Sequence, residues 1–195
     1  MAKGNLNHLS SCQRCGLHKT RTKVVIGRGT LPADILFIGE GPGSSEDIIG
    51  KPFVGPVGRV LDHLILYSAQ DAGLRRAPTF YLTNSVLCRP TDDTGKNRQP
   101  YPPEVWQCEH NLTQIINEVN PLRCVLLGEV AKRYYLRRFP GALTMYHPAY
   151  LLRKGGMETP EFRQCLANLS QLFTEVKEAR KCQKRQVSKK PHKTV

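Results

Sequence analysis

Three short apolar runs alternate along the chain with segments whose apolar residues recur at helical spacing. The run at 33–38 (ADILFI) ends at Gly39, a second run covers Phe80–Val86, and a third, Cys124–Leu127, ends at Gly128. Each run has the length of a strand and is rich in β-branched or large apolar side chains. Each therefore predicts a strand that is buried in a sheet.

Helical spacing appears in four segments, at 57–67, 104–119, 129–138 and 161–180. The second begins after Pro102 and Pro103, which suit the first turn of a helix. In the last, Phe162, Leu166, Leu169 and Phe173 form one stripe. Alternating strands and helices predict a three-layer α/β/α fold around a parallel sheet. In such folds the functional loops follow the carboxyl ends of the strands.

Charge divides the chain into a body and a tail. The 195 residues have the length of one domain, with 39% hydrophobic residues and a net charge of +13. Residues 176–195 contain eight Lys and Arg against Glu178 alone, a local net charge of +7 that leaves +6 for the remaining residues. A basic protein of this kind suits a nucleic acid partner. We expect a domain at 1–175 and a basic, disordered tail at 176–195, for which the alternative role is to solubilise the protein.

No segment predicts export or a membrane anchor. The chain has no apolar run long enough to cross a bilayer, and its first dozen residues lack the apolar stretch of a secretory signal. We expect a monomer in the cytoplasm, with no membrane partner. In that reducing compartment the seven cysteines do not predict a disulfide framework.

Four of the cysteines have the pattern of a metal centre. Cys12 and Cys15 form a C-x-x-C pair, and Cys88 and Cys108 flank a loop and the start of a helix. Four thiolates in this pattern predict a [4Fe–4S] cluster or a zinc ion. The alternative is that they are small buried side chains, which is our interpretation of Cys124 and Cys165.

Several motifs follow one another in an order that is typical of a known family. They are CQRCGLHKTRTKVVIGRG, ADILFIGEGPGSSEDIIGKPFVGPVGRVLD, YLTNSVLCRP with NRQPYPPEVWQC, VLLGE and HPAYLLR, within a resemblance that runs from about residue 12 to residue 170. Together they resemble the iron–sulfur, or type 4, uracil-DNA glycosylases. The resemblance implies a four-stranded parallel sheet and a [4Fe–4S] cluster held by Cys12, Cys15, Cys88 and Cys108.

The same resemblance assigns roles in removing uracil from DNA. Phe53 would stack on the extruded base, the Asn84 amide would read its edge, and His147 would stabilise charge on its O2 atom. Glu40 is the best candidate to activate water, with Gly41 and Pro42 shaping its loop. Without the resemblance, Asn84 would be a turn residue and His147 a loop residue.

Residues around these motifs add further expectations. Glu46 and Asp47 either support the water or the loop, or act as ordinary helix caps. In HPAYLLR, Leu151 or Leu152 would wedge into DNA and Arg153 would contact phosphate. Only 18 residues separate Gly128 from His147, fewer than the family usually has. We therefore expect less secondary structure to support the position of His147, and expect the strand that the family usually has before this histidine to be missing.

The sequence thus predicts a base excision repair enzyme that acts on uracil-containing DNA and leaves an abasic site. The alternative is a catalytically weak protein of the same fold that binds uracil-DNA or single-stranded DNA, with a phage or replication role. A relative that traps uracil covalently is disfavoured, because residues 89–103 contain no histidine. GEGPG also lacks the lysine of a P-loop and the spacing of a dinucleotide-binding loop.

Overall fold

A five-stranded sheet with the order β1-β3-β2-β4-β5 forms the middle layer of the protein. The computed structural model describes residues 6–188, without the side chains of 184 and 186–188. Four strands pair in parallel: β2 (Ile35–Gly39), β3 (Phe80–Asn84), β4 (Arg123–Leu127) and β5 (Leu143–Met145). The short β1 (Arg28–Gly29) joins β3 antiparallel. The predicted four-stranded parallel sheet is confirmed, with β1 as an antiparallel addition.

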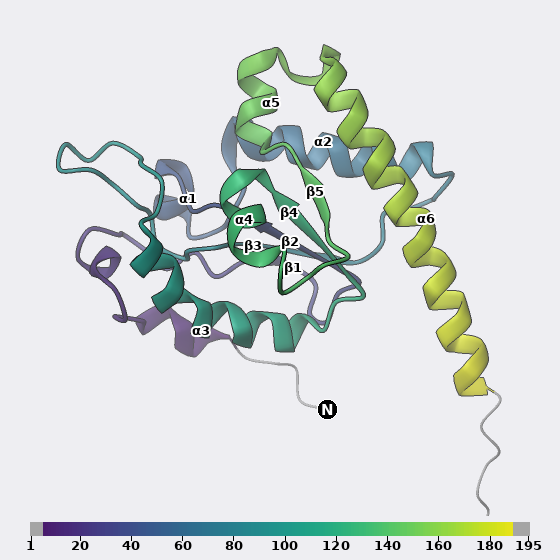
Figure 1. Cartoon of the computed structure of the whole chain (residues 1–195), viewed down its shortest axis with the longest axis horizontal. Helices are drawn as coiled ribbons and strands as arrows, with labels where there is room; N and C mark the ends of the chain where they lie inside the picture. Colours follow the sequence, from purple (N-terminus) through teal and green to yellow (C-terminus); the bar gives the residue numbers. More distant parts are fainter. Residues whose placement is uncertain (1–5, 189–195) are drawn as a thin grey trace, which may run out of the picture.

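Helices cover both faces of this sheet, as the alternating pattern predicts. The helices are α1 (Ser44–Ile49), α2 (Gly55–Asp71), α3 (Pro102–Val119), α4 (Gly128–Tyr135), α5 (Pro148–Lys154) and α6 (Pro160–Ser188). Short 3-10 helices lie at Asn7–Ser11, Gly16–Lys19 and Gly156–Glu158. In Figure 1, α3 lies on one side of the sheet and α2 and α6 on the other. No helix in the described part of the chain combines the length and the apolar character that a membrane span requires.

Two hydrophobic cores follow from the alternation of side chains along each strand. In β2, Ile35 and Phe37 join the core beneath α2, α5 and α6, whereas Leu36 and Ile38 join the core beneath α3 and α4. Successive strand residues point to opposite faces, so a strand covered on both sides is apolar throughout. The ADILFI run is therefore the central strand of a three-layer fold.

The segment before His147 differs from its prediction. The 18 residues after Gly128 include β5, which pairs with β4 so that Met145 lies opposite Leu127. The expectation of less scaffolding without a strand is therefore wrong. The connections from α4 to β5 and from β5 to α5 are short, so the 18 residues can include a three-residue strand. Pairing of β5 with β4 then fixes the chain at Met145, two residues before His147.

The predicted disordered tail is wrong for residues 176–188, which continue α6. This stretch contains no Gly or Pro and is rich in Lys, Arg, Gln and Glu, which favour helix. Val176 is buried in the core, and Arg180 forms an ion pair with the buried Asp34. Residues 189–195 of the tail, like 1–5 of the domain, lie outside the described residues.

Candidate active site

The carboxyl ends of the parallel strands surround one cavity of about 660 Å³. The loop after β2, the end of β3 and the residues after β5 all contribute to its wall. Every residue predicted to contact uracil lines it: Glu40, Gly41, Pro42, Phe53, Asn84 and His147. The structure therefore brings together side chains that the sequence places more than 100 residues apart.

Gly39 makes room for two of these side chains at the end of β2. A Cβ atom at this position would lie 2.5 Å from Oδ1 of Asn84 and 2.6 Å from Cζ of Phe53. Asn84 pairs with Gly39 across the sheet and is 2% exposed. Its amide has no hydrogen-bond partner among residues 6–188, so donor and acceptor remain free for a ligand.

Phe53 is held in a backbone conformation that non-glycine residues rarely adopt. Its φ is 52°, in the left-handed region, and its ring is buried against the cavity. Arg28 donates to the carbonyl oxygens of Pro52 (2.9 Å) and Phe53 (3.1 Å) and pairs with Asp62 at 2.6 Å. These contacts fix the loop, and with it the position of the ring.

The carboxylates of Glu46 and Asp47 both accept hydrogen bonds from backbone N–H groups. Glu46 accepts from the N–H groups of Gly43 (3.1 Å) and Val54 (3.0 Å), so it caps α1 and closes the loop that carries Phe53. Asp47 accepts from the Thr22 N–H at 2.9 Å and ties the N-terminal segment to α1. Of the two predicted alternatives, Glu46 therefore fulfils both the capping and the loop-supporting role.

Glu40 stands half-buried in the cavity wall directly after β2. Its carboxylate has no hydrogen-bond or ion-pair partner in the described part of the chain. Burial raises the pKa of Glu40 above its ordinary value, because a low-polarity environment disfavours the charged form. A partly desolvated carboxylate of this kind is a stronger base than one in water.

His147 caps the start of α5 and is neutral. Its Nδ1 accepts a hydrogen bond from the Ala149 N–H at 3.2 Å, so the ring proton is assigned to Nε2. Burial, with a smaller effect of Arg153, lowers the pKa of His147 to about 4. Its ring lies 6.2 Å from that of Phe53, centroid to centroid. The imidazole is thus a neutral donor in the cavity wall.

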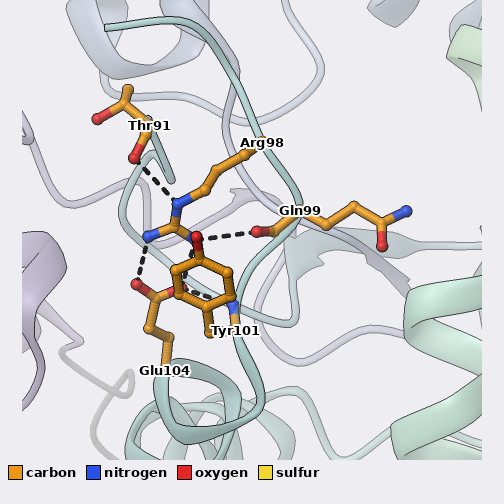
Figure 2. Close-up of polar contacts among 5 residues, drawn as sticks. All are labelled: Thr91, Arg98, Gln99, Tyr101 and Glu104. Carbon is orange, nitrogen blue, oxygen red and sulfur yellow. Dashed lines mark hydrogen bonds and ion pairs between the residues drawn. The ribbon is translucent and has the colours of Figure 1, made fainter. Parts of the chain in front are cut away.

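A further wall comes from the loop between β3 and α3, which extends from the body in Figure 1. Arg98 holds this loop, as Figure 2 shows: it donates to the carbonyl of Thr91 and binds the Glu104 carboxylate through both terminal nitrogens, at 2.8 and 2.6 Å. Its guanidinium lies 3.8 Å from the centre of the Tyr101 ring. Arg98 lines the cavity, a role that sequence analysis did not predict.

In HPAYLLR the residues after His147 belong to α5, and only some of their side chains face outward. Leu151 is fully buried in the core, which contradicts its prediction as a wedge in DNA. Helical periodicity turns Leu151 inward and leaves the next residue, Leu152, 39% exposed. Arg153 is exposed and lines the cavity, so its prediction as a DNA contact stands as a prediction.

The four predicted ligand cysteines gather on the face covered by α3. Cys88 and Cys108 are buried, and Cys12 and Cys15 are half-buried. Burial, with added repulsion from charges on Cys88, Cys15 and Cys12, raises the pKa of Cys108 to about 12. N–H groups of Asn111, Arg21 and Leu87 donate to Cys12, Cys88 and Cys108 respectively. Within residues 6–188, no three His, Cys, Asp or Glu side chains are grouped as a single metal ion would require.

Comparison with known proteins places this site in a family. Residues 26–170 match the family model described as the uracil DNA glycosylase superfamily. The chain belongs to this superfamily. The matched residues include every predicted uracil contact, together with Cys88 and Cys108. Cys12 and Cys15 precede the match.

Several uracil-DNA glycosylases of type 4 are similar to the chain. That of Thermotoga maritima is 36% identical over 77% of this chain and 82% of its own length. The enzyme of Archaeoglobus fulgidus is 38% identical over 69% of this chain and 63% of its own length. That of Pyrobaculum aerophilum is 34% identical over 82% of this chain and 88% of its own length. The resemblance stated from the motifs is confirmed.

We predict that Arg28→Ala weakens binding of a uracil-containing oligonucleotide about tenfold, because charged hydrogen bonds to the Phe53 loop are lost. Fluorescence anisotropy measures the affinity. Arg59→Ala, which removes an equal charge from the exposed side of α2, is the matched control. Equal losses in the two variants would show that Arg28 contributes only its charge.

Proposed function

We propose that the protein hydrolyses the N-glycosidic bond of uracil in DNA and leaves an abasic site. The observation that carries this proposal is that Glu40, Phe53, Asn84 and His147 line one cavity large enough for a nucleotide. Its substrate would be DNA containing uracil, in keeping with the names of the type 4 relatives. Each chain holds a whole cavity, so we propose that it acts as a monomer.

Uracil would be held by one ring and one amide. Phe53 offers an aromatic face, which contributes about 1–3 kcal/mol by stacking on any base. The free Asn84 amide offers a donor and an acceptor side by side, which complement O4 and N3–H of uracil. Cytosine has the opposite pattern at these positions. Phe53 would therefore supply affinity and Asn84 selectivity.

His147 would stabilise the departing base. Breaking the glycosidic bond leaves the bonding electron pair on uracil, shared by its O2 atom, and positive charge on the sugar. The Nε2–H donor would stabilise charge that develops only towards the transition state, an effect worth about 3–4 kcal/mol for one well-placed donor. Because burial lowers the pKa of His147 to about 4, the imidazole is neutral at any higher pH and keeps its Nε2–H donor.

Glu40 would act on the sugar side. Its carboxylate would stabilise the positive sugar and orient a water molecule. The water oxygen bonds to C1′, and its proton passes to the carboxylate, which has no competing partner among the described residues. The uracil anion leaves with the electron pair of the broken bond.

The four cysteines would hold a [4Fe–4S] cluster. They supply the thiolates that such a cluster needs, and three of them already accept N–H donors of the kind that stabilise cluster sulfur. When bound, the cluster would serve as a clamp that joins the N-terminal segment to the end of β3 and to α3. The exposed Leu152 and Arg153 would contact the DNA beside the cavity.

Excision is the first test. The protein should convert a uracil-containing oligonucleotide to alkali-labile strand breaks, and Glu40→Gln should slow the reaction about 100-fold or more while affinity stays nearly unchanged. Glu118→Gln, on the exposed side of α3, is the control. Tight binding of uracil-DNA by the unaltered protein without any excision would instead identify a binding module.

The pH dependence should report Glu40. As the pH falls, the carboxylate is protonated and kcat/KM drops, with an apparent pKa above the ordinary glutamate value of about 4.3 because burial raises it. His147 stays neutral down to a pH of about 4 and does not set this limb. In Glu40→Gln the residual activity should lose the limb. If the acidic fall in kcat/KM were unchanged in Glu40→Gln, a group other than Glu40 would cause it.

The cluster should be visible in solution. Protein purified without oxygen should be brown, with broad absorption in the blue and bound iron, and Cys88→Ala should lose both colour and iron. Cys182→Ala alters an exposed cysteine on α6 and should keep them. A colourless protein with stoichiometric zinc would contradict the cluster.

A further inference from the structure

A second cavity adjoins the first behind His147. It has a volume of about 530 Å³ and lies between the end of β5, the start of α4 and one side of α6. His147 and Tyr150 line both cavities. The two cavities are therefore neighbours, separated by these two side chains.

One wall of this cavity is an aromatic platform. Tyr146 is 43% exposed, and its ring stacks on that of Tyr150 with centroids 5.2 Å apart and planes tilted by 22°. The stack fixes the ring of Tyr146 while leaving it accessible to a ligand. A large exposed aromatic held in this way is suited to binding another flat ring.

Another part of the wall, formed by α6, carries amides. Gln164 and Asn168 lie four residues apart on α6, so their side chains share one face of the helix. In the described part of the chain neither amide has a hydrogen-bond partner. Because they line the same cavity as Tyr146, they offer donors and acceptors to a ligand bound there.

Charge in this cavity favours a base over a phosphate. The charged residues that line it are Lys132 and Glu129, which lie 3.5 Å apart and balance one another. A phosphate site would need excess positive charge, which these two residues do not supply. The ring platform and the amides match a nucleobase instead.

We propose that the second cavity binds the base next to uracil in single-stranded DNA, stacked on Tyr146. This inference rests on the proposed function, because the first cavity must hold the extruded uracil. In a duplex the neighbouring base stays paired and stacked, so it cannot enter. In a single strand it is free to do so. The subsite therefore makes uracil in single strands the preferred substrate.

The test removes one of the two rings in the proposed contact, either the DNA base next to uracil or the side chain of Tyr146. Single-stranded oligonucleotides carry uracil with normal neighbours, or with an abasic spacer on its 5′ or its 3′ side. Removing the correct neighbouring base should lower kcat/KM of the unaltered protein about tenfold, and Tyr146→Ala should cause a similar loss on the normal oligonucleotide. The two losses should not add, because each removes the same contact.

Two control variants separate the contact from damage to the site. Tyr146→Phe keeps the ring and should behave like the unaltered protein. Trp106→Ala removes a 63% exposed aromatic on α3 that lines neither cavity, and should leave the spacer effect intact. A disturbance of His147 by Tyr146→Ala would slow every substrate equally, so the spacer effect would persist.

Full addition of the two losses, or no effect of a spacer on either side, would overturn the subsite. Failure of the proposed function gives a different result, namely no excision from any oligonucleotide. In that case the same set of variants and oligonucleotides, read as affinity by fluorescence anisotropy, still tests whether Tyr146 binds the neighbouring base.

Discussion

Parallel pairing of β2 with β3 and β4, and of β4 with β5, is the constraint on which the site depends. In the observed register Gly39 lies beside Asn84, and Leu127 beside Met145, so the strands end at one edge of the sheet. Hydrogen bonding between strands stops there, and each chain turns away with its side chains free to face a ligand. A shift of one residue in any strand would turn its side chains to the opposite face and dissolve the arrangement.

Burial adjusts the acid–base character of the site in two opposite directions. It disfavours charge on any group, so it raises the pKa of Glu40 and lowers that of His147. For a carboxylate this produces a stronger base, and for an imidazole it secures a neutral donor. One physical cause therefore prepares both groups for their proposed roles, and a change that admitted water would weaken both together.

Much of this could be predicted from the sequence, because the relevant signals are local. Apolar runs that end at a glycine predicted β2 and β4, and the order of the motifs predicted the residues that line the cavity. Such local signals do not predict contacts between segments that are distant in the sequence. Arg28 holds Phe53 only because β1 pairs with β3, and a lone arginine between glycines carries no mark of that role. Leu151 and Leu152 are indistinguishable until the helix turns one of them inward. The strand β5 was missed because three residues are too few to show a period.

The anchoring of α6 at Asp34 has an electrostatic consequence. Asp34 precedes β2, so the basic end of this helix, with Lys177 and Lys181 beside Arg180, lies at the amino edge of the sheet, one strand length from the cavity. Five strand residues span about 16 Å. That is twice the screening length of about 8 Å at physiological ionic strength. Positive charge at this end of α6 is therefore too far away to perturb the titration of Glu40 or His147, so substitutions there can change the attraction of the protein to polyanions without altering its chemistry.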